Sequence, residues 1–164
     1  MRLWHKDLIK VLPRQQLVAQ WRELCCVMQN IEKNGSPNHL LVNKVLDYPA
    51  SHLIQYALLV CGEMEKRGYK VSKITRNKFL DSVATFVDKF NNANKSWKIF
   101  GDWHNNRYFK QCYCNLQEKY DCGGISQEEW DKIEVVFREW EVRTIEELEK
   151  SLDVEVKFVE KENN

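Results

Sequence analysis

Arg22 and Glu23 place a cation and a carboxylate side by side in the segment that follows Pro13. Apolar residues recur in this segment every three or four positions, which predicts one stripe of an α-helix: Leu17, Trp21, Leu24, Met28 and Ile31. By the same 3.6-residue period, Gln15 falls on the opposite side together with Arg22 and Glu23. From the pattern alone, this polar side is either a binding surface or an ordinary solvated face.

A second chemistry-bearing segment, 96–110, interleaves basic and aromatic residues as SWKIFGDWHNNRYFK. Lys98 and Arg107 supply cations, and the aromatic rings would suit unstacked bases. The alternative is that these rings seal a small core. His39 is either a phosphate contact or a surface residue. In the opening segment we expect Trp4 to be a core anchor and His5 a structural imidazole.

The six cysteines do not have the spacing of a metal site, because none of them forms a CxxC pair. We expect free thiols, some of them buried, and neither a metal nor a cofactor. The chain also contains no dinucleotide-binding, Walker or zinc-protease motif.

Length and composition fit one soluble domain: 164 residues with a mean hydropathy of −0.58. No apolar run reaches the roughly 20 residues that a membrane span requires, and no signal peptide is apparent, so we expect a cell-interior protein. The charge is divided unevenly. Residues 1–119 hold 19 Lys/Arg against 10 Asp/Glu, whereas residues 120–164 hold 6 against 14. This division is typical of polyanion binders, although the acidic end could instead be a solvated helix pair.

The periodicity predicts an all-α fold, a compact single-domain bundle around one long N-terminal helix over 14–33. Further helices are expected in the following ranges: 38–47, 50–67, 76–91, 105–119, 127–141 and 145–151. The alternation in DVEVKFV predicts a possible short C-terminal strand over 153–159. We expect residues 1–119 to form a helical domain and residues 120–164 an acidic helical extension of the same domain.

Several short segments, in order, resemble the pyrimidine-dimer DNA glycosylases, the family of the phage endonuclease V. They are the opening MRLWHKDLI, QLVAQWREL (16–24), EMEKRGYKV (63–71) and, more faintly, WHNNRYFKQCYCNLQEK (103–119). The resemblance covers roughly residues 1–119 and leaves the acidic end outside. It implies a compact helical protein that bends double-stranded DNA, flips a nucleotide and removes a damaged base.

The family's nucleophile is the backbone amine of the first residue, which forms an imine with C1′ of the sugar, and a helix glutamate assists. By position these would be Met1 and Glu23, with β-elimination at the abasic site afterwards. Arg2 is bulky, so we expect Met1 to be retained. With the basic pattern, the expected DNA contacts are Arg2, Arg14, Gln15, Arg22, His39, Lys98 and Arg107.

The residue types suit this chemistry. An α-amine has an ordinary pKa of about 7.7–8.0 against about 10.4 for lysine, so far more of it is neutral and nucleophilic at pH 7. A carboxylate near C1′ can stabilise developing positive charge and move protons. No cofactor is needed, and we expect a monomer in the cytoplasm at the nucleoid, or in a host cell if the source is viral. The alternatives are a non-catalytic nucleic-acid-binding helical module and a protein-interaction domain whose partner surface is the acidic end.

Overall fold

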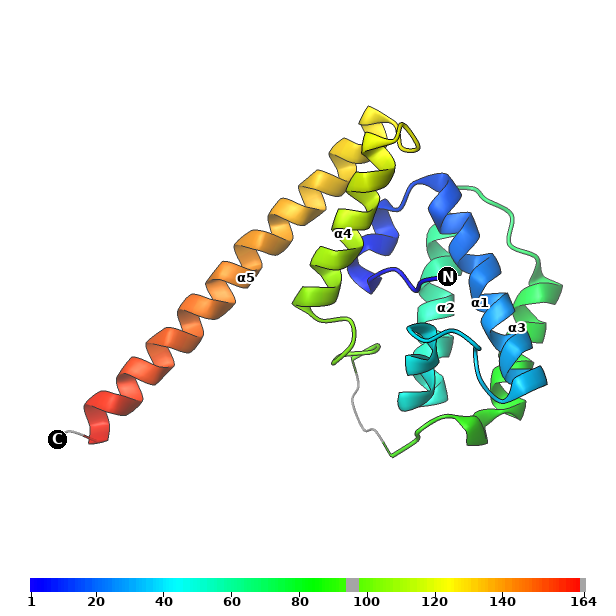
Figure 1. Ribbon diagram of the computed structural model, residues 1–164, viewed down its shortest axis with the longest axis horizontal. Helices are drawn as coiled ribbons and strands as arrows, with labels where there is room; N and C mark the ends of the chain where they lie inside the picture. The colour runs from blue at the N-terminus through cyan, green and yellow to red at the C-terminus, as the bar shows by residue number, and fades with distance from the viewer. Residues whose placement is uncertain (94–97, 163–164) are drawn as a thin grey trace.

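The computed structural model describes residues 1–93 and 98–162, with side chains as far as Lys150. Five α-helices and three 3₁₀ turns make up this part of the chain (Figure 1): η1 (Lys6–Val11), α1 (Arg14–Asn34), η2 (Val42–Asp47), α2 (Ala50–Lys66), α3 (Lys73–Thr85), η3 (Val87–Lys89), α4 (Asn106–Asp121) and α5 (Gln127–Glu162). The described residues contain no strand, and the all-α prediction is confirmed.

Helix α1 follows the apolar stripe that the sequence shows. Pro13 precedes its first residue, and the helix ends at Gly35, whose φ of 73° is the left-handed conformation that glycine adopts readily. All five residues of the predicted stripe are buried, and Gln20 and Val27 are buried with them. The helix spans Arg14–Asn34, against the predicted 14–33.

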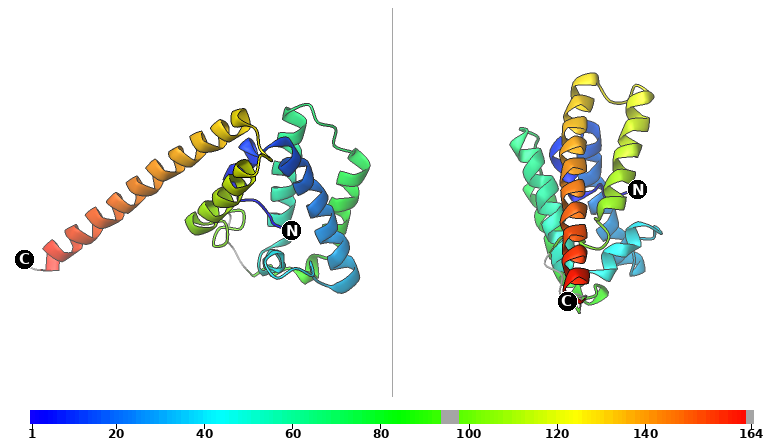
Figure 2. Two further views of the ribbon diagram at one scale, coloured as in Figure 1. Left: turned by 45° about the horizontal axis from the view of Figure 1, so that its top comes forward. Right: turned by 90° about the vertical axis from the view of Figure 1, so that its left-hand side faces the viewer.

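The core lies where α1 crosses α2 and α3, and where η1 packs against α2 and α5. Helices α4 and α5 form an antiparallel pair beside η1 (Figures 1 and 2). The start of α5 belongs to this core, because Trp130, Ile133 and Trp140 are buried. Trp140 stacks on Phe109 of α4 with ring centroids 4.7 Å apart. The acidic end is therefore attached to the basic body through apolar packing.

Two predicted boundaries were wrong in the middle of the chain. No α-helix forms over 38–47; the segment contains a turn and the short η2, and Leu40 is 93% exposed. Asn38 has a φ of 56°, which interrupts a helix at its start. The helix expected over 76–91 begins at Lys73, because Ser72 caps it by accepting from Thr75 N–H, and ends at Thr85 before η3.

The acidic end also differs from its prediction. A single helix, α5, continues to Glu162, where two helices and a strand over 153–159 were expected. Thr144 does not cap a new helix, because its hydroxyl donates to the Trp140 carbonyl one turn earlier. A continued helix pairs its backbone internally, whereas a lone strand would have no neighbour to pair with. The second half of α5 runs away from the helical body (Figure 1).

None of the helices in the described part combines the length and apolar character of a bilayer-spanning segment. Trp97 of the interleaved segment lies outside the described residues.

Candidate active site at the N-terminal segment

Residues 2–4 form an extended segment that crosses the middle of α1. The backbone N–H of Arg2 donates to Oε2 of Glu23 at 3.2 Å. The N–H of Trp4 donates to Oε1 of Gln20 at 2.8 Å. Gln20 and Glu23 are one turn apart, so a single face of α1 accepts the backbone N–H groups of both Arg2 and Trp4. Helix α1 thereby brings the start of the chain to the predicted carboxylate.

Two tyrosines on other helices hold the same segment from the opposite side. The Tyr56 hydroxyl of α2 donates to the Trp4 carbonyl at 2.6 Å. The Tyr108 hydroxyl of α4 donates to the Leu3 carbonyl at 2.7 Å. Burial raises the pKa of both tyrosines, so both hydroxyls keep the protons that they donate. Residues 2–4 are thus fixed by side chains of α1, α2 and α4.

Met1 precedes this fixed segment and is itself 42% exposed. Its α-amine belongs to the residue directly before the N–H that contacts Glu23, and the start of the chain lies beside α1 (Figure 1). Glu23 is half-buried, whereas Arg22 and Gln15 are exposed on the polar side of the helix. The structure thus brings the Arg2 backbone to Glu23, with Met1 exposed directly before this contact.

Arg2 takes a conformation that the sequence did not reveal. Its guanidinium carbon lies 5.5 Å from the centre of the Trp4 ring. One of its terminal nitrogens, Nη1, is buried without a hydrogen-bond partner among the described residues. The side chain is folded against the protein rather than extended into solvent, so a phosphate contact would require it to turn outward.

The EMEKRGYKV segment has a structural role at this site. Arg67 donates to the carbonyls of Leu12 at 2.6 Å and Lys10 at 2.8 Å, at the end of η1, and pairs with Glu63 at 2.6 Å. Gly68, with a φ of 76°, turns the chain after α2. The forked guanidinium thus connects the end of α2 to the end of η1.

His5 and His104 stack with ring centroids 5.1 Å apart, directly after the fixed segment. His5 Nε2 donates to the His104 carbonyl at 2.8 Å, and Nδ1 of His104 accepts from the Lys6 N–H at 3.1 Å. Burial lowers the pKa of His5 to about 4 and that of His104 well below its ordinary value, so both rings are neutral at pH 7. The prediction that His5 is structural and Trp4 is a core anchor is confirmed.

The aromatic residues of the interleaved segment belong to the core. Phe100, Trp103, Tyr108 and Phe109 are all buried, so these four rings are not platforms for bases, and the core alternative is correct for them. Phe100 has a φ of 49°, a strained conformation that the surrounding aromatic cluster maintains. Lys98 and Arg107 are exposed.

Two predicted DNA contacts lie away from Glu23. Arg14 begins α1, nine residues earlier, which is about 13 Å along the helix axis. The guanidinium carbon of Arg14 lies 5.4 Å from the centre of the Tyr69 ring, and the backbone N–H of Arg14 donates to Oε1 of Glu129 at 3.3 Å. His39 lies beyond the other end of α1, where its Nδ1 accepts from the Val42 N–H at 3.4 Å.

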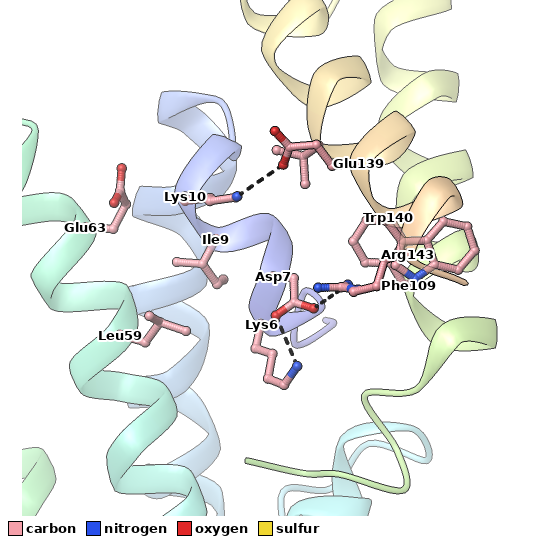
Figure 3. Close-up of a pocket in the computed structure, with 11 residues that line it drawn as sticks. Lys6, Asp7, Ile9, Lys10, Leu59, Glu63, Phe109, Glu139, Trp140 and Arg143 are labelled. Carbon is pink, nitrogen blue, oxygen red and sulfur yellow. Dashed lines mark hydrogen bonds and ion pairs between the residues drawn. The ribbon is translucent and has the colours of Figure 1, made fainter. Parts of the chain in front are cut away.

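A pocket of about 320 Å³ lies between η1, α2 and α5 (Figure 3). Its cations are paired with carboxylates: Lys6 and Arg143 with Asp7, and Lys10 with Glu139. The Arg143–Asp7 and Lys10–Glu139 pairs join η1 to α5, and the pairing leaves no excess positive charge for a phosphate. We therefore interpret this pocket as part of the packing contact between α5 and the rest of the helical domain.

Sequence reasoning missed Gln20, Tyr56 and Tyr108. Gln20 is fully buried although glutamine is usually exposed, and its period places it at the edge of the apolar stripe. Tyr108 contacts a residue 105 positions away, which no local pattern reveals. The described part of the chain contains no cluster of three or more His, Cys, Asp or Glu that could hold a metal ion.

The family model for pyrimidine dimer DNA glycosylases matches residues 1–77. No curated protein and no solved structure matches the chain. The matched range contains QLVAQWREL and EMEKRGYKV, and it includes Glu23, Gln20, Tyr56 and Arg67; the fainter similarity at 103–119 lies outside it. The segment that positions the chain start against Glu23 is therefore the part of this protein that matches the pyrimidine dimer DNA glycosylase family, over residues 1–77.

Proposed function

We propose that this protein is a DNA repair glycosylase that removes a damaged base and then cleaves the abasic site. The family match indicates that the damage is a pyrimidine dimer. The observation that supports this most is the 3.2 Å contact between the Arg2 N–H and Glu23 beside an exposed Met1. A free amine and a carboxylate on one open surface are the two groups that imine chemistry at C1′ requires.

In the proposed reaction the neutral Met1 amine attacks C1′ while the bond from C1′ to the base breaks. The base leaves with the bonding electron pair and receives a proton. Loss of an amine proton and opening of the sugar ring give an imine at C1′. Removal of a proton from C2′ then expels the 3′ phosphate with its electron pair, and water releases the sugar fragment from the amine.

Glu23 has two roles in this scheme. Its carboxylate stabilises the positive charge that develops on the sugar as the base leaves, and it moves protons between the amine and the ring oxygen. Because its Oε2 already accepts from the Arg2 N–H, the carboxylate is oriented toward the chain start. No cofactor takes part in these steps.

Gln20, Tyr56 and Tyr108 act as positioning residues, since each holds a backbone group of residues 3–4 rather than the reacting atoms. Placing a nucleophile accurately accounts for a large share of many enzymatic rates, and an error of about 1 Å can cost 100-fold. The three buried hydrogen bonds restrict where Met1 can move.

The exposed Arg22 and Gln15, and Arg2 once its side chain turns outward, supply the proposed contacts to double-stranded DNA. Flipping a nucleotide costs a few kcal/mol and least where stacking is already damaged, which favours a lesion. We propose that the protein is a monomer that acts in the cytoplasm at the nucleoid, or in a host cell if the source is viral. In this proposal residues 1–119 form the glycosylase part, and residues 120–164 are an extension of the same domain.

The test uses a variant with one glycine added before Met1, assayed on duplexes that contain a pyrimidine dimer or an abasic site. The added residue displaces the amine by about 3.8 Å and leaves every side chain in place. We expect strand cleavage by the native chain, and loss of cleavage with unchanged DNA affinity in the extended variant. Equal cleavage by both proteins would exclude the Met1 α-amine as the nucleophile. Binding without cleavage by the native chain would instead identify a non-catalytic DNA-binding module.

A further inference from the structure

A pocket of about 220 Å³ lies between η2 and the start of α4, and it differs from the pocket in Figure 3 in its charge. Lys44 of η2 and Arg107 of α4 both line it. Both cations are exposed, and neither has a carboxylate partner among the residues that the structure describes. Asp102 is the one acidic residue in the lining, so the pocket carries a net positive charge.

The wall of the pocket also holds a buried hydrogen-bond donor. Trp103 lines it and is 4% exposed, and its indole N–H has no partner among the described residues. A buried N–H without a partner is rare in folded proteins. Two cations without ion-pair partners, beside a buried and unpartnered N–H in the wall, fit an anionic ligand with several acceptor oxygens.

The pocket adjoins the candidate active site through a shared side chain. Tyr108 lines the pocket, and its hydroxyl donates to the Leu3 carbonyl in the segment that leads to Met1. Asn105 caps α4 by accepting from the Tyr108 N–H at 3.0 Å, which fixes the wall in which Arg107 lies. A group bound between Lys44 and Arg107 would therefore be held in a fixed position relative to the chain start.

We propose that this pocket binds a phosphate of the DNA backbone and sets the position of the strand against the Met1 amine. The inference rests on the proposed function, because it assumes that the strand passes the chain start. A guanidinium can contact two phosphate oxygens at once, and the lysine adds a second cation from the opposite wall. Lys44 was not among the residues that the sequence suggested.

The first experiment measures the salt dependence of binding to an undamaged duplex. Each phosphate contact adds about 0.9 to the slope of log affinity against log salt concentration. We expect Lys44→Ala and Arg107→Ala to lower this slope by about one unit when combined. Lys119→Ala removes an exposed cation near the far end of α4 and is the charge-matched control for either single variant; it should leave the slope unchanged.

The second experiment replaces single phosphates of the duplex with neutral methylphosphonates. One position should weaken binding to the native chain and have no effect on the Lys44→Ala/Arg107→Ala variant. Equal sensitivity of both proteins at every position would overturn the proposal. A titration with inorganic phosphate is the third arm: binding that these two substitutions abolish, with an unchanged DNA salt slope, would identify a site for free phosphate and would also overturn it.

Reductive trapping on abasic DNA separates this inference from the proposed function. Trapping by the native chain with an unchanged salt slope in the variants would refute the phosphate pocket and leave the glycosylase in place. A lower slope in the variants without trapping by the native chain would support the pocket in a protein that only binds DNA.

Discussion

Tyr108→Phe is the substitution that most directly probes how the chain start is held. It removes the hydroxyl that donates to the Leu3 carbonyl at 2.7 Å and keeps the ring. Leu3 is fully buried, so no water can replace the lost donor without rearrangement. An unsatisfied buried carbonyl costs about 1–3 kcal/mol. For a chain of this size the melting temperature should fall by roughly 2–4 °C per kcal/mol, or about 2–12 °C in all.

The chemical effect should exceed the effect on stability. Without the Tyr108 hydroxyl, Arg2 and Trp4 keep their hydrogen bonds to α1, but Leu3 loses its hydrogen bond to α4. If the amine then moves by about 1 Å, the rate of imine formation should fall by up to 100-fold, with DNA affinity unchanged. Single-turnover borohydride trapping on abasic DNA measures this rate, and a binding titration measures the affinity.

The matched control is Tyr120→Phe, near the opposite end of the same helix. Its hydroxyl contacts Gln127 at an exposed position, so its loss should change the free energy of unfolding by about 0.5 kcal/mol or less and leave trapping unchanged. If Tyr108→Phe lowered the melting temperature but trapped DNA as fast as the native chain, the claim that this tyrosine positions the amine would be refuted.

Three further predictions concern the same region. Glu23→Gln keeps the acceptor for the Arg2 N–H but removes the charge, so base release on lesion DNA should fall by about 10²–10⁴-fold while the melting temperature changes little; an unchanged rate would exclude Glu23 from the chemistry. Burial holds the pKa of His5 at about 4, below its ordinary 6.5, so the unfolded chain binds more protons between these values. The free energy of unfolding should therefore fall by about 2–3 kcal/mol between pH 7 and pH 4.5 in urea titrations, and a flat profile would contradict the buried neutral pair. Arg67→Lys cannot reach the Leu12 and Lys10 carbonyls together, so it should destabilise the fold by about 1–3 kcal/mol in the same titrations, whereas Lys66→Arg on the exposed neighbouring position should not.

Local patterns predicted those parts of the fold in which one helix face decides the structure. The stripe from Leu17 to Ile31 is buried along its length, and Gly35 ends the helix as a left-handed residue. The QLVAQWREL and EMEKRGYKV segments, which carry the resemblance, both lie within residues 1–77, the range that the family model matches.

The errors arose where tertiary contacts or the absence of a neighbour decide the outcome. Alternation in 153–159 indicated a strand, but a strand needs a partner and α5 continues instead. The charge split did not show how the acidic end packs against the body. The structure shows that Trp130 and Trp140 bury the start of α5 in the core, so removal of residues 121–164 would expose Phe109 rather than simply uncover a basic face.

The candidate site was predictable in type but not in detail. The resemblance implied Met1 and Glu23 by position, whereas the contacts that hold residues 3–4 come from Gln20, Tyr56 and Tyr108 on three helices. For the interleaved aromatic residues the sequence left base contacts and core packing both open, because segment composition does not distinguish a ring in contact with a base from a ring in the core.

The most direct measurement is borohydride reduction of the complex with abasic DNA, followed by mass mapping of the peptide that carries the sugar fragment. The proposed mechanism predicts a single adduct on the α-amine of Met1, which is lost when a glycine precedes that residue. An adduct on a lysine side chain, or no adduct with any damaged duplex, would contradict it.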